Sequence, residues 1–133
     1  KSDLSDLSRI NLTDQKDEII NKIKKAKTDT LPMPSTIEEL ENRPEAKNLI
    51  GIYSSLTGFS LEKTINEFSG KNFSEFKENL SNVVVDEIVP ISNEIKKLLN
   101  DKNFLDEILF EGCNKADAIA SKKVKKIHKI LGF

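Results

Sequence analysis

The sequence is poor in the residues that mark several protein classes. It has one cysteine, one histidine and no tryptophan in 133 residues, which excludes an internal disulfide and a structural zinc site and fits a reducing compartment. Five glycines and four prolines are too few for a collagen-like or low-complexity chain, or for an all-β sandwich with its frequent turns. No apolar run is long enough to cross a bilayer, and no secretory leader is recognisable. We therefore expect a soluble, cytoplasmic protein.

Charges are distributed unevenly along the chain, although the net charge is only −1. Residues 1–30 carry seven basic and six acidic side chains, residues 31–114 carry eight and fifteen, and residues 115–133 carry six and one. A basic C-terminal segment after an acidic body is typical of a polyanion-binding surface. A solvated helix end is the simpler interpretation, because the helix dipole favours lysine there. Both interpretations stay open.

The N-terminal part of the sequence predicts a loop over residues 1–12 and a helix over residues 14–27. Thr13 is a suitable N-cap, and apolar residues recur at helical spacing behind it. Acidic residues favour the first turn of such a helix, and this one would begin with Asp14, Asp17 and Glu18. Residues 28–43 contain two prolines with serine and threonine, so we expect a loop or flexible linker with one helical turn at 36–41.

Helical periodicity is stronger in the remainder of the chain. A helix is expected from Pro44 to a left-handed stop at Gly58, followed by a short helix between Ser60 and Gly70. Beyond these, a long helix capped by Ser74 keeps its apolar stripe across Pro90, which should kink it.

A final helix over residues 103–131 completes the pattern. It has an apolar stripe that includes Gly112, Ala116 and Ala120, which would let a neighbouring helix approach closely. No segment reads as a strand. The sequence thus predicts an all-α fold, a bundle of four to five helices.

Motifs for autonomous catalysis are absent. The sequence has no glycine-rich phosphate loop after a strand, no G-x-S-x-G and no H-E-x-x-H, and we expect no metal site. Cys113 lies on an apolar stripe and is expected to be a buried small hydrophobe. His128 lies among lysines on an expected solvated face, and Tyr53 lies on a core stripe. An enzyme complete in itself is not indicated.

Several segments carry a more specific pattern when they are read in order. The chain begins with Lys1 and Ser2, continues with DLSRINLTDQKDEIINKIKKAKTD and then RPEAKNLIGIYSSLTGFSLEKTINEFSGKNFSEFKENL, and later contains VVDEIVPISNEI and EGCNKADAIA before ending in LGF. Together these segments resemble the C-terminal region of bacterial-type class I tryptophanyl-tRNA synthetases, starting within the KMSKS signature. The resemblance covers essentially the whole chain.

This resemblance implies that residues 1–12 are a remnant of the signature loop and residues 13–133 an α-helical anticodon-binding domain. Lys1 and Ser2 match the last two positions of the signature, whose lysine holds the ATP phosphates in the family. The intact enzyme would attach L-tryptophan to tRNA-Trp through a tryptophanyl adenylate, using ATP with Mg²⁺, and would be a homodimer. The chain alone would lack the Rossmann catalytic domain, contain no catalytic residue or cofactor, and bind tRNA; a monomeric state of the chain stays open.

Candidate tRNA contacts follow from the distribution of basic side chains. Lysines at helical spacing on the last helix share one face and could meet phosphates, or could simply be solvated. Arginine in the loop before Pro44 is versatile enough to read bases, and could equally pair with a nearby carboxylate. The candidates are Lys22, Lys25, Arg43, Lys122, Lys126 and Lys129. The competing hypothesis is a helical protein-interaction module with no nucleic-acid role, which would explain the acidic middle of the chain.

Overall fold

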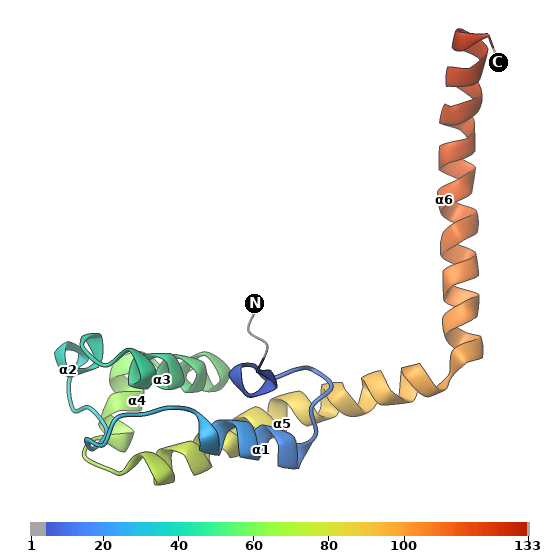
Figure 1. The fold of residues 1–133 in the computed structure, drawn as a ribbon. Coiled ribbons are helices and arrows are strands. Elements are labelled where there is room, and N and C mark those ends of the chain that lie inside the picture. The colour runs from blue at the N-terminus through green and yellow to red at the C-terminus, as the bar shows by residue number, and fades with distance from the viewer. Residues whose placement is uncertain (1–4, 133) are drawn as a thin grey trace. The chain divides into compact units, whose positions relative to one another are not determined.

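The computed structural model describes residues 5–132, all in helices, turns or loops with no strand (Figure 1). Lys1 and Ser2 lie outside the described residues. The chain divides into two compact units, the first ending at Asn93 and the second beginning at Glu94. The elements are a 3₁₀ turn η1 (Asp6–Ser8) and the helices α1 (Lys16–Lys25), α2 (Ile37–Glu41), α3 (Pro44–Thr57), α4 (Leu61–Phe68), α5 (Phe73–Asn100) and α6 (Lys102–Leu131).

The all-α class is confirmed, and α3 and α4 have the predicted boundaries. Pro44 is the first residue of α3, and Gly58 ends that helix in the left-handed region at φ +71°, where a side chain would be strained. Ser60 caps α4 by accepting a hydrogen bond from the backbone N–H of Lys63 at 3.2 Å. The proline, glycine and serine that the sequence places at these helix ends therefore predict the ends correctly.

Two other predicted N-caps are wrong. Helix α1 begins after Gln15, not after Thr13, and the backbone N–H of Gln15 donates to the Glu18 carboxylate at 2.7 Å. The long helix α5 begins one residue before Ser74, and the side chain of Asn72 accepts from the backbone N–H of Glu75 at 2.9 Å. In both cases an amide residue two positions away from a plausible hydroxyl residue takes the position at the helix start.

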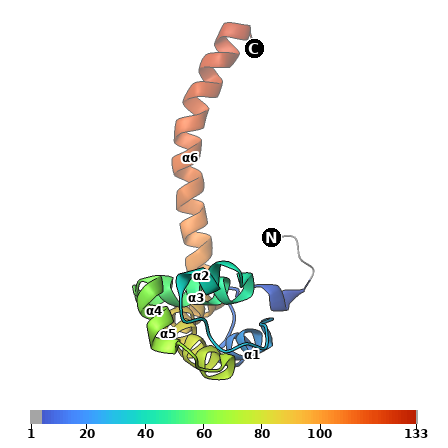
Figure 2. The same cartoon turned by 90° about the vertical axis from the view of Figure 1, so that its left-hand side faces the viewer.

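The core of the first unit is built around three aromatic rings. Tyr53 packs edge-on against Phe68 with 5.2 Å between ring centroids, and Phe68 packs edge-on against Phe76 at 5.0 Å. These are favourable geometries for aromatic pairs. The rings come from α3, α4 and α5, and Figures 1 and 2 show α1 beside α5 in the same unit. The expected bundle is therefore found in this unit, and Tyr53 is a core residue as predicted.

The segment over residues 28–43 is packed against this core. It contains α2, at the position of the predicted turn, and it buries Met33 and Pro34. The backbone of Met33 donates to the carbonyl of Lys71 at 2.8 Å and accepts from the N–H of Gly70 at 3.2 Å. These bonds attach the segment to the turn between α4 and α5.

Helix α5 runs through Pro90 without interruption, as the periodicity predicts. Proline offers no N–H to the carbonyl of Asp86, so the helix loses one bond there. Its stripe is buried from Phe73 to Val84, but Ile91 is 44% exposed.

Helix α6 forms as predicted, but none of its described residues is buried. Asp101 caps it by accepting from the N–H of Phe104 at 3.0 Å. The expected burial of its stripe is wrong, and Cys113 is exposed rather than buried. Within the second unit only the last residues of α5 accompany α6, too few to cover a 30-residue helix.

The burial pattern predicts how two phenylalanines respond to truncation. Phe76 is fully buried, so Phe76→Ala should lower the free energy of unfolding by about 3–5 kcal/mol. Phe110 on α6 is 70% exposed, and Phe110→Ala should change it by less than about 0.5 kcal/mol. Urea unfolding of both variants measures the difference. Equal costs would contradict the assignment of the core.

Candidate nucleic-acid interface

Lys22 is the candidate contact whose environment differs most from expectation. Its side chain is 6% exposed, and its Nζ lies 2.6 Å from the Asp14 carboxylate and 2.8 Å from that of Asp6. Asp14 precedes α1 and is therefore not in its first turn, where the sequence predicts it. Besides pairing with Lys22, its carboxylate accepts a hydrogen bond from the backbone N–H of Asn11 at 2.9 Å. The Lys22 ammonium is therefore engaged in holding the segment before α1 onto that helix.

Burial and hydrogen bonding compete at this pair. Burial alone would raise the pKa of Asp14, but hydrogen bonds from Lys22 and Asn11 outweigh it and hold that pKa below its ordinary value. Burial alone would lower the pKa of Lys22, and hydrogen bonds to Asp14 and Asp6 more than reverse this. Both partners are consequently charged at neutral pH.

Arg43 is engaged by a carboxylate too. Its Nε and Nη2 donate hydrogen bonds to Oδ2 and Oδ1 of Asp29, at 2.9 and 2.6 Å. Its Nη1 donates to the carbonyl of Pro32 at 2.7 Å. It also lies over the ring of Phe73, 5.5 Å from the centroid. Hydrogen bonds from Arg43 lower the pKa of Asp29. The structure therefore shows the alternative in which Arg43 pairs with a nearby carboxylate, here that of Asp29.

The other four lysine candidates are exposed. Lys25 lies in the last turn of α1, and Lys122, Lys126 and Lys129 lie on α6 at spacings of four and three. Residues at these spacings share a helix face, and seven residues of helix rise about 10 Å. The structure thus offers a short row of ammonium groups on α6.

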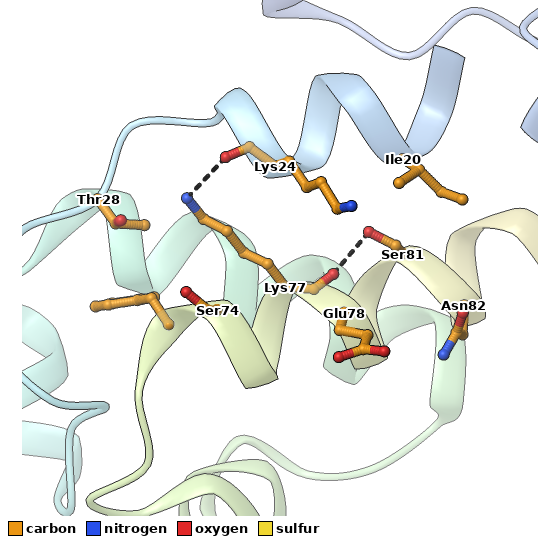
Figure 3. A pocket seen from close by; sticks show the side chains of 9 residues that line it. Ile20, Lys24, Thr28, Ser74, Lys77, Glu78, Ser81 and Asn82 are labelled. Atoms are coloured by element: carbon orange, nitrogen blue, oxygen red, sulfur yellow. Dashed lines mark hydrogen bonds between the residues drawn. The ribbon is translucent and has the colours of Figure 1, made fainter. Parts of the chain in front are cut away.

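A polar pocket of about 580 Å³ lies between α1 and α5 in the first unit (Figure 3). Lys77 of α5 reaches across it, and its Nζ donates to the carbonyls of Ala26 at 2.6 Å and Lys24 at 3.3 Å. These carbonyls end α1 without intrahelical partners, so Lys77 satisfies them. Burial lowers the pKa of Lys77. Lys24 extends from α1 into the space between the two helices (Figure 3).

Sequence reasoning missed this pocket, although a signal for it exists. Ser74, Lys77, Glu78, Ser81 and Asn82 follow one another at spacings of three, one, three and one, which places them along one polar face of α5. The opposite face carries the predicted core stripe, which the structure buries at Phe76, Leu80 and Val84. Which second helix would face the polar side could not be read from spacing alone.

No group of three or more His, Cys, Asp or Glu side chains in residues 5–132 is placed to hold a metal ion. Within that part of the chain no helix has the length and apolar character needed to cross a bilayer.

Comparison with known proteins identifies similar sequences along the whole chain. All 133 residues align with tryptophan–tRNA ligases of Agrobacterium fabrum at 47% identity, Caulobacter vibrioides at 44% and Rickettsia felis at 47%. The chain spans 38%, 39% and 40% of these relatives, respectively. The matched portion is their C-terminal part. No family model matches the chain.

The buried ion pair generates a prediction about stability and pH. Lys22→Met leaves the Asp14 carboxylate buried without its partner, and should lower the free energy of unfolding by about 3 kcal/mol at neutral pH. Since the native pKa of Asp14 lies below its ordinary 3.8, the contribution of the pair is present above that pH and is lost as the pH falls through the lowered value. The deficit of the variant should therefore shrink in acid.

Urea unfolding of the wild type and Lys22→Met at neutral and strongly acidic pH measures this deficit. Lys25→Met, on the exposed side of the same helix, is the matched control and should cost less than about 0.5 kcal/mol. A deficit that is the same at both pH values, or a control that costs as much, would contradict the role of the pair.

Proposed function

We propose that the chain belongs to the family of bacterial tryptophan–tRNA ligases, whose C-terminal part it matches, and that it is the tRNA-binding region of such an enzyme. The observation that carries the proposal is the alignment of all 133 residues with these ligases at 44–47% identity. The described residues form helices without strands, which supports a role other than amino-acid activation, since ATP and tryptophan would need a further domain.

In the intact enzyme we infer an ATP- and Mg²⁺-dependent reaction that attaches L-tryptophan to tRNA-Trp through a tryptophanyl adenylate. We assign Lys1 and Ser2 to the end of the KMSKS signature, where a lysine neutralises charge developing on the ATP phosphates. The homodimeric state and cytoplasmic location expected for the family are part of the same proposal. Residues 13–133 would form the tRNA-binding region, and the chain alone would act without a cofactor.

The proposed tRNA footprint consists of exposed lysines. Lys25, Lys122, Lys126 and Lys129 can each approach a phosphate without breaking a described contact. Lys22 and Arg43 are left out, because their charges already hold carboxylates in the first unit. Phosphate neutralisation by lysines supplies affinity but no base readout.

A helical protein-interaction module is the second candidate, and the exposed stripe of α6 favours it. Leu109, Ile119 and Ile130 are each about 70% exposed there. Exposed apolar rows of this kind mark protein contacts. The two candidates differ in salt dependence: tRNA binding through several phosphates weakens steeply with salt, whereas burial of an apolar stripe does not.

The proposal predicts that this chain activates no amino acid. A residue at the end of the KMSKS signature cannot position ATP without the surrounding catalytic domain. Tryptophan-dependent exchange of pyrophosphate into ATP, measured on the purified chain, should stay at background. Exchange above that of a heat-inactivated sample would show that the chain carries a catalytic site.

The lysine row on α6 predicts a change in salt dependence. Replacing Lys122, Lys126 and Lys129 with Gln should weaken binding of every tRNA about equally, and should reduce the slope of log K against log salt by about 0.7–0.9 for each lost contact. Fluorescence anisotropy with tRNA-Trp and an unrelated tRNA measures both quantities.

Lys16, Lys96 and Lys102 provide a matched control, because they are exposed lysines outside the proposed footprint. Their triple replacement with Gln should leave the slope unchanged. If both triple variants lose the same affinity and slope, binding is a general effect of charge and the footprint is wrong. If the wild type shows no salt-dependent tRNA binding at all, the proposed function itself is wrong.

A further inference from the structure

We propose that Asp6, held by the ammonium group of Lys22, is a positioning residue for the signature residues Lys1 and Ser2. The proposal rests on the proposed function, which assigns Lys1 and Ser2 to the end of the KMSKS signature. It goes further, because it names the contact through which the helical region would act on the ATP phosphates. Asp6 was not among the candidate residues that the sequence indicated.

The segment before α1 has little apolar burial to fix it in place. None of residues 5–13 is buried, and η1, which lies in this segment, contains no buried residue. Leu7 and Ile10 line an apolar pocket of about 470 Å³ but remain 48% and 36% exposed. The backbone N–H groups of Ser8 and Asp14 donate to carbonyls only three residues earlier. Because ordering a segment costs conformational entropy, its attachment to α1 depends on side-chain contacts.

Asp6 makes the contact between η1 and α1. Its Oδ2 lies 2.8 Å from Nζ of Lys22, which follows 16 positions later in the sequence. Its Oδ1 accepts a hydrogen bond from Nδ2 of Asn11 at 3.0 Å and lies 3.2 Å from Nη2 of Arg9. Hydrogen bonds from Lys22 and Asn11 hold the pKa of Asp6 below its ordinary value. One ionised carboxylate therefore connects the start of the segment both to its later residues and to the helix.

Lys22 is a fixed partner for Asp6. Its side chain is 6% exposed, whereas that of Asp6 is 58% exposed, and its ammonium group also lies 2.6 Å from the buried carboxylate of Asp14. A lysine that is already held on one side loses little further side-chain entropy when it binds a second carboxylate. Removal of Asp6 leaves Lys22 paired with Asp14, so no buried charge loses its partner. Substitution of Asp6 should therefore release η1 and preserve the buried pair.

The length of chain between Lys1 and the nearest anchored residue decides how much this contact matters. Asp6 is five positions from Lys1, and the next anchored residue, Asn11, whose backbone N–H donates to Asp14, is ten positions from it. An extended chain spans at most about 3.5 Å per residue, so release of Asp6 extends the reach of Lys1 from roughly 18 Å to roughly 35 Å. The effective concentration of a tethered group falls with about the −3/2 power of tether length, so doubling the tether lowers it about threefold.

The position of the signature lysine should affect the rate of the reaction more than substrate binding. A lysine that neutralises charge developing on the ATP phosphates acts in the transition state. Its displacement should lower kcat for amino-acid activation and leave the KM for tryptophan unchanged. If Asp6 only stabilised the fold, its removal would instead reduce the fraction of active enzyme, and each remaining active site would keep its normal kcat.

The test compares Asp6→Ala with Asp17→Ala in the intact ligase of which this chain is the C-terminal part. Asp17 is an exposed carboxylate in the first turn of α1, so its variant has the same change of charge and keeps the contact between Asp6 and Lys22. Tryptophan-dependent exchange of pyrophosphate into ATP gives kcat and KM, and titration of active sites gives the fraction of active enzyme. We expect Asp6→Ala to lower kcat per active site about threefold, with the KM for tryptophan unchanged. Asp6→Glu keeps a carboxylate and should recover most of the rate.

A second measurement, on the chain alone, tests the attachment of the segment. The ¹⁵N–¹H NOE values of residues 7–11 should fall in Asp6→Ala relative to the wild type and Asp17→Ala, because the segment gains motion on the picosecond to nanosecond timescale. The urea midpoints of the two variants should agree. A lower midpoint or a smaller fraction of active sites in Asp6→Ala, with kcat per active site unchanged, would show a purely structural role and overturn the proposal.

The wild-type measurement separates this proposal from the proposed function. If the intact wild type catalyses the exchange and Asp6→Ala has the kcat of Asp17→Ala, the positioning role is wrong and the proposed function stands. If the intact wild type shows no tryptophan-dependent exchange, the proposed function is wrong and the positioning role is wrong with it.

Discussion

The contact between Lys22 and Asp14 is the constraint on which the arrangement of α1 depends. Two opposite charges that are almost fully buried must stay together, because either one alone would remain in a poorly solvated position. The pair ties the segment before α1 to that helix, and the side chain of Gln15 in the same segment bonds to the buried Ser92 of α5. At the other end of α1, Lys77 takes up its terminal carbonyls. With both ends of α1 attached, a polar pocket is maintained between α1 and α5.

The basic residues of the chain thus serve two different purposes. Lys22, Arg43 and Lys77 are held by oxygen atoms of the protein itself and stabilise the first unit. Lys25 and the row on α6 are exposed and are the residues we assign to RNA phosphates. Net charge and its distribution do not separate these groups, since each lysine counts the same in a sum. Burial and the identity of the nearest oxygen atom do separate the paired basic residues from the exposed ones.

Much of the fold could be predicted from the sequence, because helix stripes and end signals are local. The stripes of α3 and α4, the stop at Gly58 and the continuity of α5 through Pro90 all depend on neighbours within a few residues. The pairing of Lys22 with Asp14, or of Arg43 with Asp29, joins residues 8 and 14 positions apart and depends on how the chain turns between them. The stripe of α6 predicted burial that the described chain does not supply, so Cys113 was misassigned. Identification of the candidate RNA surface therefore needed both the structure and the relatives.

We propose that this chain reads tRNA as the C-terminal part of a tryptophan–tRNA ligase. Filter binding of the wild-type chain to tRNA-Trp and to transcripts with single anticodon substitutions tests it most directly. The account predicts that a wrong anticodon base costs about 1–3 kcal/mol in binding free energy at constant salt. Equal affinities for tRNA-Trp and every substituted transcript would contradict it.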